Sequence, residues 1–590
     1  MASNNSPFHS LKIIYRNLPS RNKIQVLTLL LIMILGGFLE FLSVGLLFPL
    51  LQLLTGEINE SNEGLYNSDP SYLNYFNQFE VGKLTTILLI LVFSAGAIRL
   101  YINWKSGLIA ASIGNRLAKD SFKSLLSKEY DNYLLIDTHK QISTVTIQVT
   151  RCVSAITSSL KLIASFIIGT FLSSSLLYLK PFLTIYSTIF FAIIYLIIIK
   201  FSRKRLTSFS FIISESNKFN LKYVKEALTG FREIKMNRSE RFFLDRFKNN
   251  DLKLRTHTAY SNFYATFPRY AIETIMIAVI ILFATLSLSS SLKIFIPTIG
   301  IFAFTTQKLL PLIQQIYGGW ARLKNAQFDL QNVCSLIYKP KSANQEKTTF
   351  NFISINNNNK EFNFSNLKLI NVDYRYPNTK SNVLNNINLT INQGEIIGIK
   401  GISGSGKTTM VDIMSGLLKP LNGDVLVNNK SIIGDINYLH RTNWSKFIAY
   451  VPQNIFLSDQ SITNNIAFGI EDELIDIERV KKCLEMVQLN NISTQLNEAF
   501  HYKKIGDGGI RLSGGQRQRI GIARALYRKC DVLILDEGTS ALDSFTEQNI
   551  IKTISNLPSN LTIIMVAHRL STLNICNQIY TLENGNIQKN

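Results

Sequence analysis

A glycine-rich turn between an apolar strand and a helix start occupies residues 394–414, GEIIGIKGISGSGKTTMVDIM. The run from Gly401 to Thr408 fits the spacing G-x-x-x-x-G-K-S/T in the strand–loop–helix context that this spacing requires. Glycines let backbone N–H groups close around phosphate oxygens, a lysine reaches the β- and γ-phosphates, and a hydroxyl can bind Mg²⁺. The segment predicts a nucleotide site whose candidate contacts are Gly401, Ser403, Gly404, Ser405, Gly406, Lys407, Thr408 and Thr409.

Two adjacent acids end a second apolar strand, DVLILDE, at residues 531–537. Asp536 suits the Mg²⁺ shell, and Glu537 suits polarising a water that attacks the terminal phosphate. Adjacent acids at a strand end are usually only solvated, but here they belong to a chain that also has a phosphate-binding loop. The combination favours hydrolysis, with Glu537 as a catalytic residue and Thr408 and Asp536 as metal ligands.

The segment LSGGQRQR, residues 512–519, lies between these two motifs. It resembles the signature of the ATP-binding cassette (ABC) transporters, and further elements of that family match in order. The resemblance implies that Tyr376 stacks on adenine, that Gln453 contacts Mg²⁺ during catalysis, and that His568 senses the γ-phosphate as a catalytic residue. SALD, at 540–543, resembles the D-loop of the family. ATP is therefore the expected nucleotide and Mg²⁺ the expected cofactor.

In that family the phosphate-binding loop of one cassette faces the signature of another. The resemblance therefore implies that γ-phosphate held by Lys407 of one chain is bound by a second chain, through Ser513, Gly514, Gly515 and Gln516. A chain with one cassette fused to one membrane domain resembles half of an exporter-type transporter. The simplest assembly is a homodimer with a second copy of the same chain.

Apolar residues are concentrated in the first 340 positions of the 590-residue chain. Only 17% of all residues are charged, against about 25% in an average soluble domain. A bilayer-spanning helix needs about 20 mostly apolar residues, and six runs qualify: 24–54, 84–104, 153–178, 181–200, 268–290 and 296–318. One such run could be a buried core helix, but six predict a membrane domain of six spanning helices. A cytoplasmic α/β P-loop NTPase (ABC) domain follows them.

The loops indicate how the spans are oriented. Residues 55–82 contain five acids and no Lys or Arg, whereas residues 200–255 contain fifteen Lys or Arg against six acids. Cytoplasmic loops of membrane proteins carry the excess of positive charge. Both termini and the cassette are therefore expected in the cytoplasm, with the spans in the inner or plasma membrane. The net charge of +22 then has an explanation without nucleic acid. The basic amphipathic stretch 8–18 fits either an interfacial helix or a simple tail.

Composition divides the chain into a transmembrane domain at 1–337, a polar, Asn-rich linker at 338–363 and the ATP-binding cassette at 364–590. The two long cytoplasmic loops have apolar residues at helical spacing, so spans 2 to 5 should continue past the membrane as paired rods. The bends near 131–136 and 229–237 are the candidate contacts with cassettes.

Charged side chains inside spans are costly and indicate function by default. Arg99, Arg269 and Lys308 lie on three predicted spans and could line one cavity that binds an anion. Glu273, one turn from Arg269, and the more distant Glu40 are the nearby acids, so a basic excess should remain. Alternatively, the two arginines extend to lipid headgroups, and Arg269 pairs with Glu273.

Three local features resemble the flippases for lipid-linked oligosaccharides: the first span, PRYAIE in the fifth and KLLP in the sixth. The resemblance implies ATP-driven export or flipping of an amphipathic substrate, a lipid-linked oligosaccharide or a similar anionic lipid. Exporters of peptides, drugs or lipid A-like molecules share the same cassette and stay open. An ATP-gated regulatory membrane protein without net transport also stays open, whereas a soluble ABC ATPase that acts on DNA or ribosomes is disfavoured by the spans.

Overall fold

The computed structural model describes residues 6–55, 81–179, 181–286, 292–338, 364–377, 379–433, 444–489, 504–536, 544–555, 557–567 and 570–590. The chain divides into two units. The first unit comprises Met1–Ser127 and Asp137–Thr349, and the second comprises Lys128–Ile136 and Phe350–Asn590. The passage from one unit to the other after Thr349 falls inside the predicted linker.

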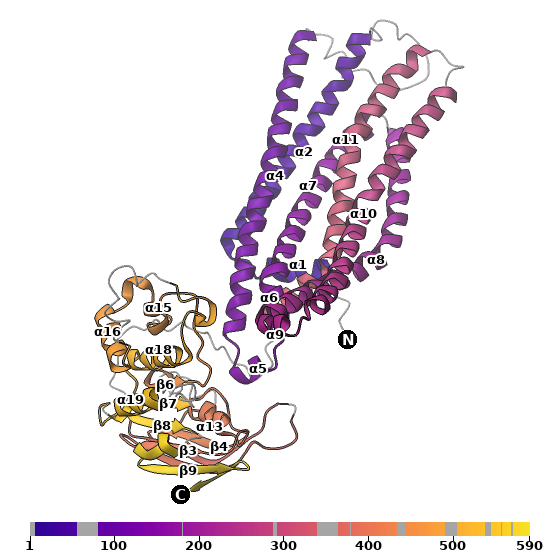
Figure 1. Ribbon diagram of the computed structural model, residues 1–590. Coiled ribbons are helices and arrows are strands. Elements are labelled where there is room, and N and C mark those ends of the chain that lie inside the picture. The colour runs from indigo at the N-terminus through magenta and orange to yellow at the C-terminus, as the bar shows by residue number, and fades with distance from the viewer. Residues whose placement is uncertain are drawn as a thin grey trace. The chain divides into compact units, whose positions relative to one another are not determined.

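Long helices build the first unit (Figure 1). The long ones are α2 (Ser20–Thr55), α4 (Val81–Leu126), α7 (Val149–Leu179), α8 (Pro181–Thr229), α10 (Glu240–Leu286) and α11 (Leu292–Asn325). Shorter helices are α1 (Pro7–Arg16), α6 (Thr138–Ser143), the π-helical turn η2 (Thr144–Gln148), α9 (Phe231–Met236) and α12 (Gln327–Ile337). Each of the six predicted spans overlaps one long helix.

Three of these helices continue far beyond the length of a span. Helices α4, α8 and α10 contain 46, 49 and 47 residues. At about 1.5 Å per residue they are roughly 70 Å long, more than twice the ~30 Å hydrocarbon core of a bilayer. The two long basic loops are therefore helical over most of their length, and their location in the cytoplasm stays a prediction.

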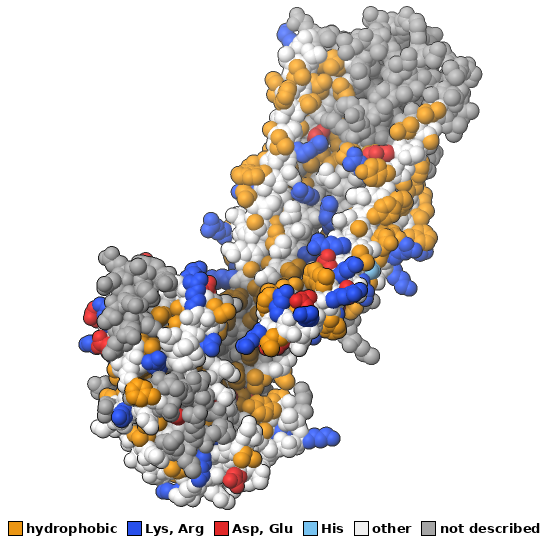
Figure 2. Space-filling model, in the orientation of Figure 1, with side chains coloured by type: hydrophobic (Ala, Val, Ile, Leu, Met, Phe, Trp, Pro, Cys, Tyr) orange, Lys and Arg blue, Asp and Glu red, His pale blue; other side chains and the backbone are white. Residues whose placement is uncertain are grey.

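Several helices carry a surface that suits lipid rather than water. Among the described residues, three stretches are long and apolar enough to cross a membrane: Ser20–Leu47, Gly82–Leu126 and Thr138–Ser175. On α4, the side chains of Ile90, Phe93 and Leu100 are exposed by 68%, 75% and 74%, and Figure 2 shows many apolar side chains on the surface of the long helices. Apolar area of this extent is unfavourable in water. That all six long helices, including α8, α10 and α11, cross a bilayer remains a prediction.

Small residues allow the helices to pack closely. Gly319 of α11 faces α7, where a Cβ atom would lie 2.9 Å from Leu162 Cβ and 3.0 Å from the Ser158 carbonyl oxygen. Any larger residue at this position would push the two helices apart.

The stretch predicted to be amphipathic near the N-terminus is helical, and its buried Ile14 lies in one apolar cluster with Leu330 of α12.

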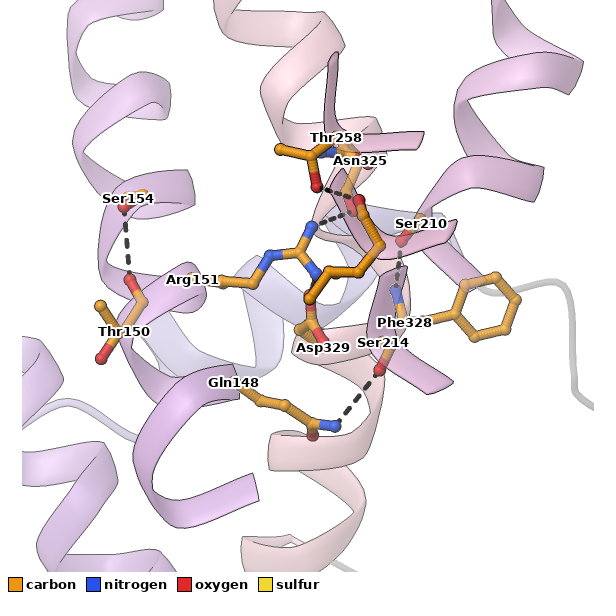
Figure 3. Close-up of polar contacts among 11 residues, drawn as sticks. Gln148, Thr150, Arg151, Ser154, Ser210, Ser214, Thr258, Asn325, Phe328 and Asp329 are labelled. Atoms are coloured by element: carbon orange, nitrogen blue, oxygen red, sulfur yellow. Dashed lines mark hydrogen bonds and ion pairs between the residues drawn. The ribbon is translucent and has the colours of Figure 1, made fainter. Parts of the chain in front are cut away.

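A buried polar network ties α12 to α7 and α8 (Figure 3). The Arg151 guanidinium on α7 lies 2.9 Å from the Asp329 carboxylate on α12 and donates to the Asn325 carbonyl at 3.3 Å. The Gln148 amide donates to the Ser214 hydroxyl of α8 at 3.2 Å. Because the Asp329 side chain is fully buried, this charge depends on its partners rather than on water.

The second unit contains two sheets (Figure 1). The order β2-β1-β4-β5 forms an antiparallel sheet of β1 (Asn366–Tyr374), β2 (Leu384–Asn392), β4 (Asn422–Val427) and β5 (Lys430–Ser431). The order β10-β9-β3-β8-β7-β6 forms a mainly parallel sheet of β3 (Ile396–Lys400), β6 (Ile448–Val451), β7 (Val532–Asp536), β8 (Thr562–Val566), β9 (Gln578–Glu583) and β10 (Asn586–Lys589). Its helices include α13 (Lys407–Met414), α15 (Ile462–Ile466), α16 (Ile477–Met486), α18 (Gly514–Tyr527) and α19 (Ser544–Ser555).

The parallel sheet explains why motifs that are distant in sequence converge. Strands β3, β8, β7 and β6 are successive neighbours, and their parallel pairing places their carboxyl ends at one edge. Ligands of open α/β sheets bind at this edge. The glycine-rich turn follows β3, Asp536 ends β7, and Gln453 comes two residues after β6.

A short helix from the predicted membrane domain belongs to the second unit. Helix α5 (Tyr130–Leu134) contains Asp131, whose carboxylate accepts a 2.9 Å hydrogen bond from the Tyr374 hydroxyl of β1. Glu129, next to this helix, pairs with Lys419 at 2.7 Å. The bend predicted near 131–136 thus packs as part of the cassette unit, in agreement with its expected role as a contact.

Candidate functional site

The glycine-rich turn has the compact backbone that its sequence predicts. A Cβ atom at Gly401 would lie 2.4 Å from the Leu582 carbonyl oxygen, so only glycine fits there. Gly406 has a φ of +104°, in the left-handed region that favours glycine. The Lys407 ammonium donates to the carbonyl oxygens of Gly401 and Ile402, each at 2.9 Å. The lysine is therefore held over the loop into which phosphates would bind.

Two observations show that this loop fits a phosphate chain. The Ser405 hydroxyl is buried and has no hydrogen-bond partner among the described residues, although buried hydroxyls are normally paired. Gly404 has a φ of +81° and open space on the side where a Cβ would project. The loop leads directly into the N-terminus of α13, whose backbone N–H groups and dipole favour negative charge. The arrangement can bind phosphate oxygens.

Asp536, the first of the two adjacent acids that end the second apolar strand, lies beside the loop. Asp536, at the end of β7, is 4% exposed. One of its carboxylate oxygens accepts hydrogen bonds from the Thr408 hydroxyl at 3.2 Å and from the Tyr450 hydroxyl at 3.0 Å. Carboxylate and hydroxyl oxygens are the ligands that Mg²⁺ prefers. The structure therefore brings together the predicted ligands Thr408 and Asp536 in a set that fits Mg²⁺.

Sequence reasoning missed two residues of this region. Burial, and then repulsion by Asp536, raise the pKa of the Asp412 carboxyl on α13 to about 6. Burial and the same carboxylate raise the pKa of Tyr450, so its hydroxyl stays protonated and donates. The signal that could have identified Tyr450 is a hydroxyl on an otherwise apolar strand, IAYV, because a buried hydroxyl needs a partner.

Tyr376 and Gln453 border the same edge. The Tyr376 hydroxyl lies 3.0 Å from the Thr409 hydroxyl, and its ring packs edge-to-face on Tyr374 with 5.1 Å between centroids. Tyr376 is thus close to helix α13, and its stacking on adenine stays a prediction. Gln453 is exposed after β6. Glu537, His568 and the segment 540–543 lie outside the described residues.

The signature segment begins α18. The Ser513 hydroxyl accepts a hydrogen bond from the backbone N–H of Gln516 at 3.2 Å, and the Gln516 side chain accepts from the Ser513 backbone N–H at 2.9 Å. This reciprocal capping box fixes the start of the helix. Gly514 and Gly515 form the first turn, where backbone N–H groups lack helical partners and favour an anion.

The structure also places the charged residues of the predicted spans. The Arg99 guanidinium on α4 pairs with the buried Glu40 carboxylate on α2. Arg269 pairs with Glu273 on α10 at 3.0 Å, and Gln314 of α11 donates to the same carboxylate at 3.5 Å. Glu40 is therefore a partner of Arg99 rather than a distant acid, which corrects that part of our expectation.

The pairing changes where a basic excess can come from. Both acids have arginine partners, so the excess of one positive charge among the predicted substrate residues rests on Lys308. This residue belongs to α11, but its side chain lies outside the described residues.

Comparisons with known proteins agree with this geometry. The family described as "ABC transporter" matches residues 384–540. The heterocyst differentiation ATP-binding protein of a Nostoc species is 28% identical over 99% of this chain and 93% of its own length. An ATP-dependent lipid A-core flippase of Cupriavidus metallidurans is 37% identical over 37% of this chain and 36% of its own length. A solved bacterial Atm1-family ABC exporter with ATP bound superposes with a TM-score of 0.75 and 18% identity, covering 96% of this chain and 94% of that one.

Proposed function

Because the chain belongs to the ABC transporters, with an exporter-type helical membrane domain and an ATP-hydrolysing cassette in one polypeptide, we propose that it flips an anionic, lipid-linked substrate across the membrane. A lipid-linked oligosaccharide is the specific candidate. The spans lie in the inner or plasma membrane, with the termini and the cassette in the cytoplasm. ATP hydrolysis drives the transport.

The cassette residues have distinct parts in hydrolysis. The phosphate-binding loop and Lys407 hold the phosphates of ATP, and Tyr376 stacks on its adenine. Thr408, Asp536 and Gln453 supply the oxygen ligands for Mg²⁺, which neutralises charge on the phosphates when it is bound. Glu537 polarises the attacking water, and His568 senses the γ-phosphate.

A second copy of the chain completes the site. The Ser513 hydroxyl accepts a hydrogen bond within its capping box, and its proton stays available for donation to a phosphate. The backbone N–H groups of Gly514 and Gly515 lie in the first turn of α18 and have no helical acceptors. They can therefore donate to the same phosphate as the Ser513 hydroxyl. We therefore assign the signature of one copy to the ATP held by the other, so that ATP binding joins two cassettes and hydrolysis separates them.

The observation that supports an anionic substrate is the exposure of two guanidinium groups on predicted spans. The side chains of Arg99 and Arg269 are 51% and 56% exposed although each contacts a carboxylate. A guanidinium has five N–H donors in a planar fork, so an arginine that pairs with one carboxylate can still bind phosphate. Lys308 adds a third positive formal charge on the predicted spans.

The test uses purified protein in proteoliposomes with three labelled lipids: a lipid-diphosphate sugar, a lipid A-like molecule and a neutral lipid. Arg269→Ala and Lys308→Ala should each weaken binding of the lipid-diphosphate sugar by about 10- to 100-fold, the range expected for a lost hydrogen bond to a charged group. Flipping of this lipid at low concentration should fall accordingly. Basal ATPase activity should not change. Arg255→Ala is the matched control, because Arg255 forms an equivalent pair with Asp251 on the same helix. Undiminished flipping in both variants, or transport of the neutral lipid alone, would leave these residues as headgroup anchors.

A further inference from the structure

Tyr450 connects two parts of the cassette that hydrolysis has to bring together. It lies on β6, whose parallel partner β7 ends in Asp536. Its side chain reaches past its own strand partner, Ile534, to the carboxylate two residues further along β7. Two residues after Tyr450 comes Pro452, and then Gln453 begins the loop beyond the strand.

We propose that Tyr450 is a positioning residue for the metal site, holding the Asp536 carboxylate in the orientation that receives Mg²⁺. The Asp536 oxygen that accepts from Tyr450 at 3.0 Å also accepts from Thr408 at 3.2 Å. Two hydroxyl donors from two different elements, β6 and α13, therefore fix one carboxylate oxygen. This inference rests on the proposed assignment of Asp536 and Thr408 as Mg²⁺ ligands.

Fixing the carboxylate matters because Mg²⁺ demands near-ideal octahedral geometry. A carboxylate that rotates freely would lose conformational entropy each time the metal binds. Groups that hydrogen-bond a ligating carboxylate are the usual means of avoiding this loss, and their removal typically weakens metal binding by about 10- to 100-fold. Tyr450 also ties the carboxylate to β6, the strand that Gln453 follows after two residues.

The competing explanation is purely structural. A tyrosine that lies against a buried core needs an acceptor for its hydroxyl, and Asp536 would then serve only as that acceptor. The two explanations differ in what the hydroxyl changes. A structural hydroxyl affects the stability of the cassette without nucleotide, whereas a positioning hydroxyl affects the affinity for the metal.

Tyr450→Phe separates them, because it removes the hydroxyl and keeps the ring. We would measure binding of Mn²⁺, as a spectroscopic substitute for Mg²⁺, to the full-length protein with ATP by electron paramagnetic resonance. Tyr580→Phe is the matched control: its hydroxyl donates to Gln578 at 2.8 Å on β9 of the same sheet. Asp536→Asn is the reference for loss of the metal ligand, and thermal unfolding without nucleotide reports on folding.

The expected result is Mn²⁺ binding weakened about 10- to 100-fold in Tyr450→Phe, with ATP affinity in EDTA unchanged and ATPase activity recovering at high Mg²⁺ concentration. Tyr580→Phe should match the wild type. Unchanged Mn²⁺ affinity in Tyr450→Phe, together with weakened binding in Asp536→Asn, would overturn this inference alone. Unchanged Mn²⁺ affinity in Asp536→Asn would overturn the proposed metal site and the inference with it.

Discussion

The buried ion pair between Arg151 and Asp329 allows a test of how a buried charge affects the stability of the first unit. Arg151→Met removes the cation and leaves a carboxylate whose side chain is 0% exposed. Breaking a buried pair from one side costs about 3–5 kcal/mol, because an uncompensated charge stays buried. In a unit of this size such a loss should lower the unfolding temperature by roughly 5–10 °C at pH 7.5.

The pH dependence of the same pair follows from the pKa of Asp329. Burial raises this pKa from 3.8 to about 6, even though Arg151 and then Ser214 act in the opposite direction. A difference of about 2 units corresponds to ~3 kcal/mol. The folded state holds the Asp329 proton more tightly than the unfolded chain does. The stabilisation of the fold by this proton is therefore complete below about pH 4 and is lost as the pH rises through about 6. Acidification from pH 7.5 to 5 should therefore stabilise the wild type by about 1–1.5 kcal/mol more than Asp329→Asn.

Thermal unfolding in detergent, followed by intrinsic fluorescence at both pH values, measures these effects. The double variant Arg151→Met/Asp329→Leu should recover most of the lost stability, since it buries no charge. Arg241→Met is the control, because Arg241 forms an exposed pair with Asp245 that contributes about 0–1 kcal/mol. The reasoning is refuted if the double variant is as unstable as Arg151→Met, or if Asp329→Asn keeps the full pH dependence of the wild type.

Three further predictions concern the cassette. Glu537→Gln should bind ATP but hydrolyse it about 10²- to 10⁴-fold more slowly, since the amide cannot act as a base; near-normal turnover in an ATPase assay would remove Glu537 from the mechanism. A mixture of Lys407→Ala and Ser513→Arg chains should recover ATP binding at one composite site per dimer, whereas normal hydrolysis by Ser513→Arg alone would exclude a shared site. Tyr374→Phe removes the hydrogen bond to Asp131, so amide hydrogen exchange in 128–136 should accelerate by about tenfold or more; unchanged exchange would mean that other contacts hold this segment.

The sequence was most informative where function and local structure depend on contiguous residues. The phosphate-binding loop could be predicted from one short segment, because its glycines, its lysine and its helix start follow each other directly. The Tyr374–Asp131 contact joins residues 243 positions apart, and no local sequence pattern predicts it. The pairing of Arg99 with Glu40 depends on the rotational setting of two long helices against each other. A one-residue rotation of either helix would separate these side chains, and spacing within each helix does not determine it.

Several residues of the cassette serve the fold and the chemistry at once, which governs how they can be tested. Ser513 starts α18 through its capping box, and losing such a cap costs about 0.5–2 kcal/mol. A Ser513 variant that fails to hydrolyse ATP could therefore fail because the helix start has frayed. Ser513→Asn keeps a side-chain oxygen that can cap the helix, whereas Ser513→Ala removes it. If Ser513→Asn unfolds at the wild-type temperature but no longer hydrolyses ATP, the hydroxyl acts on the nucleotide and not only on the helix.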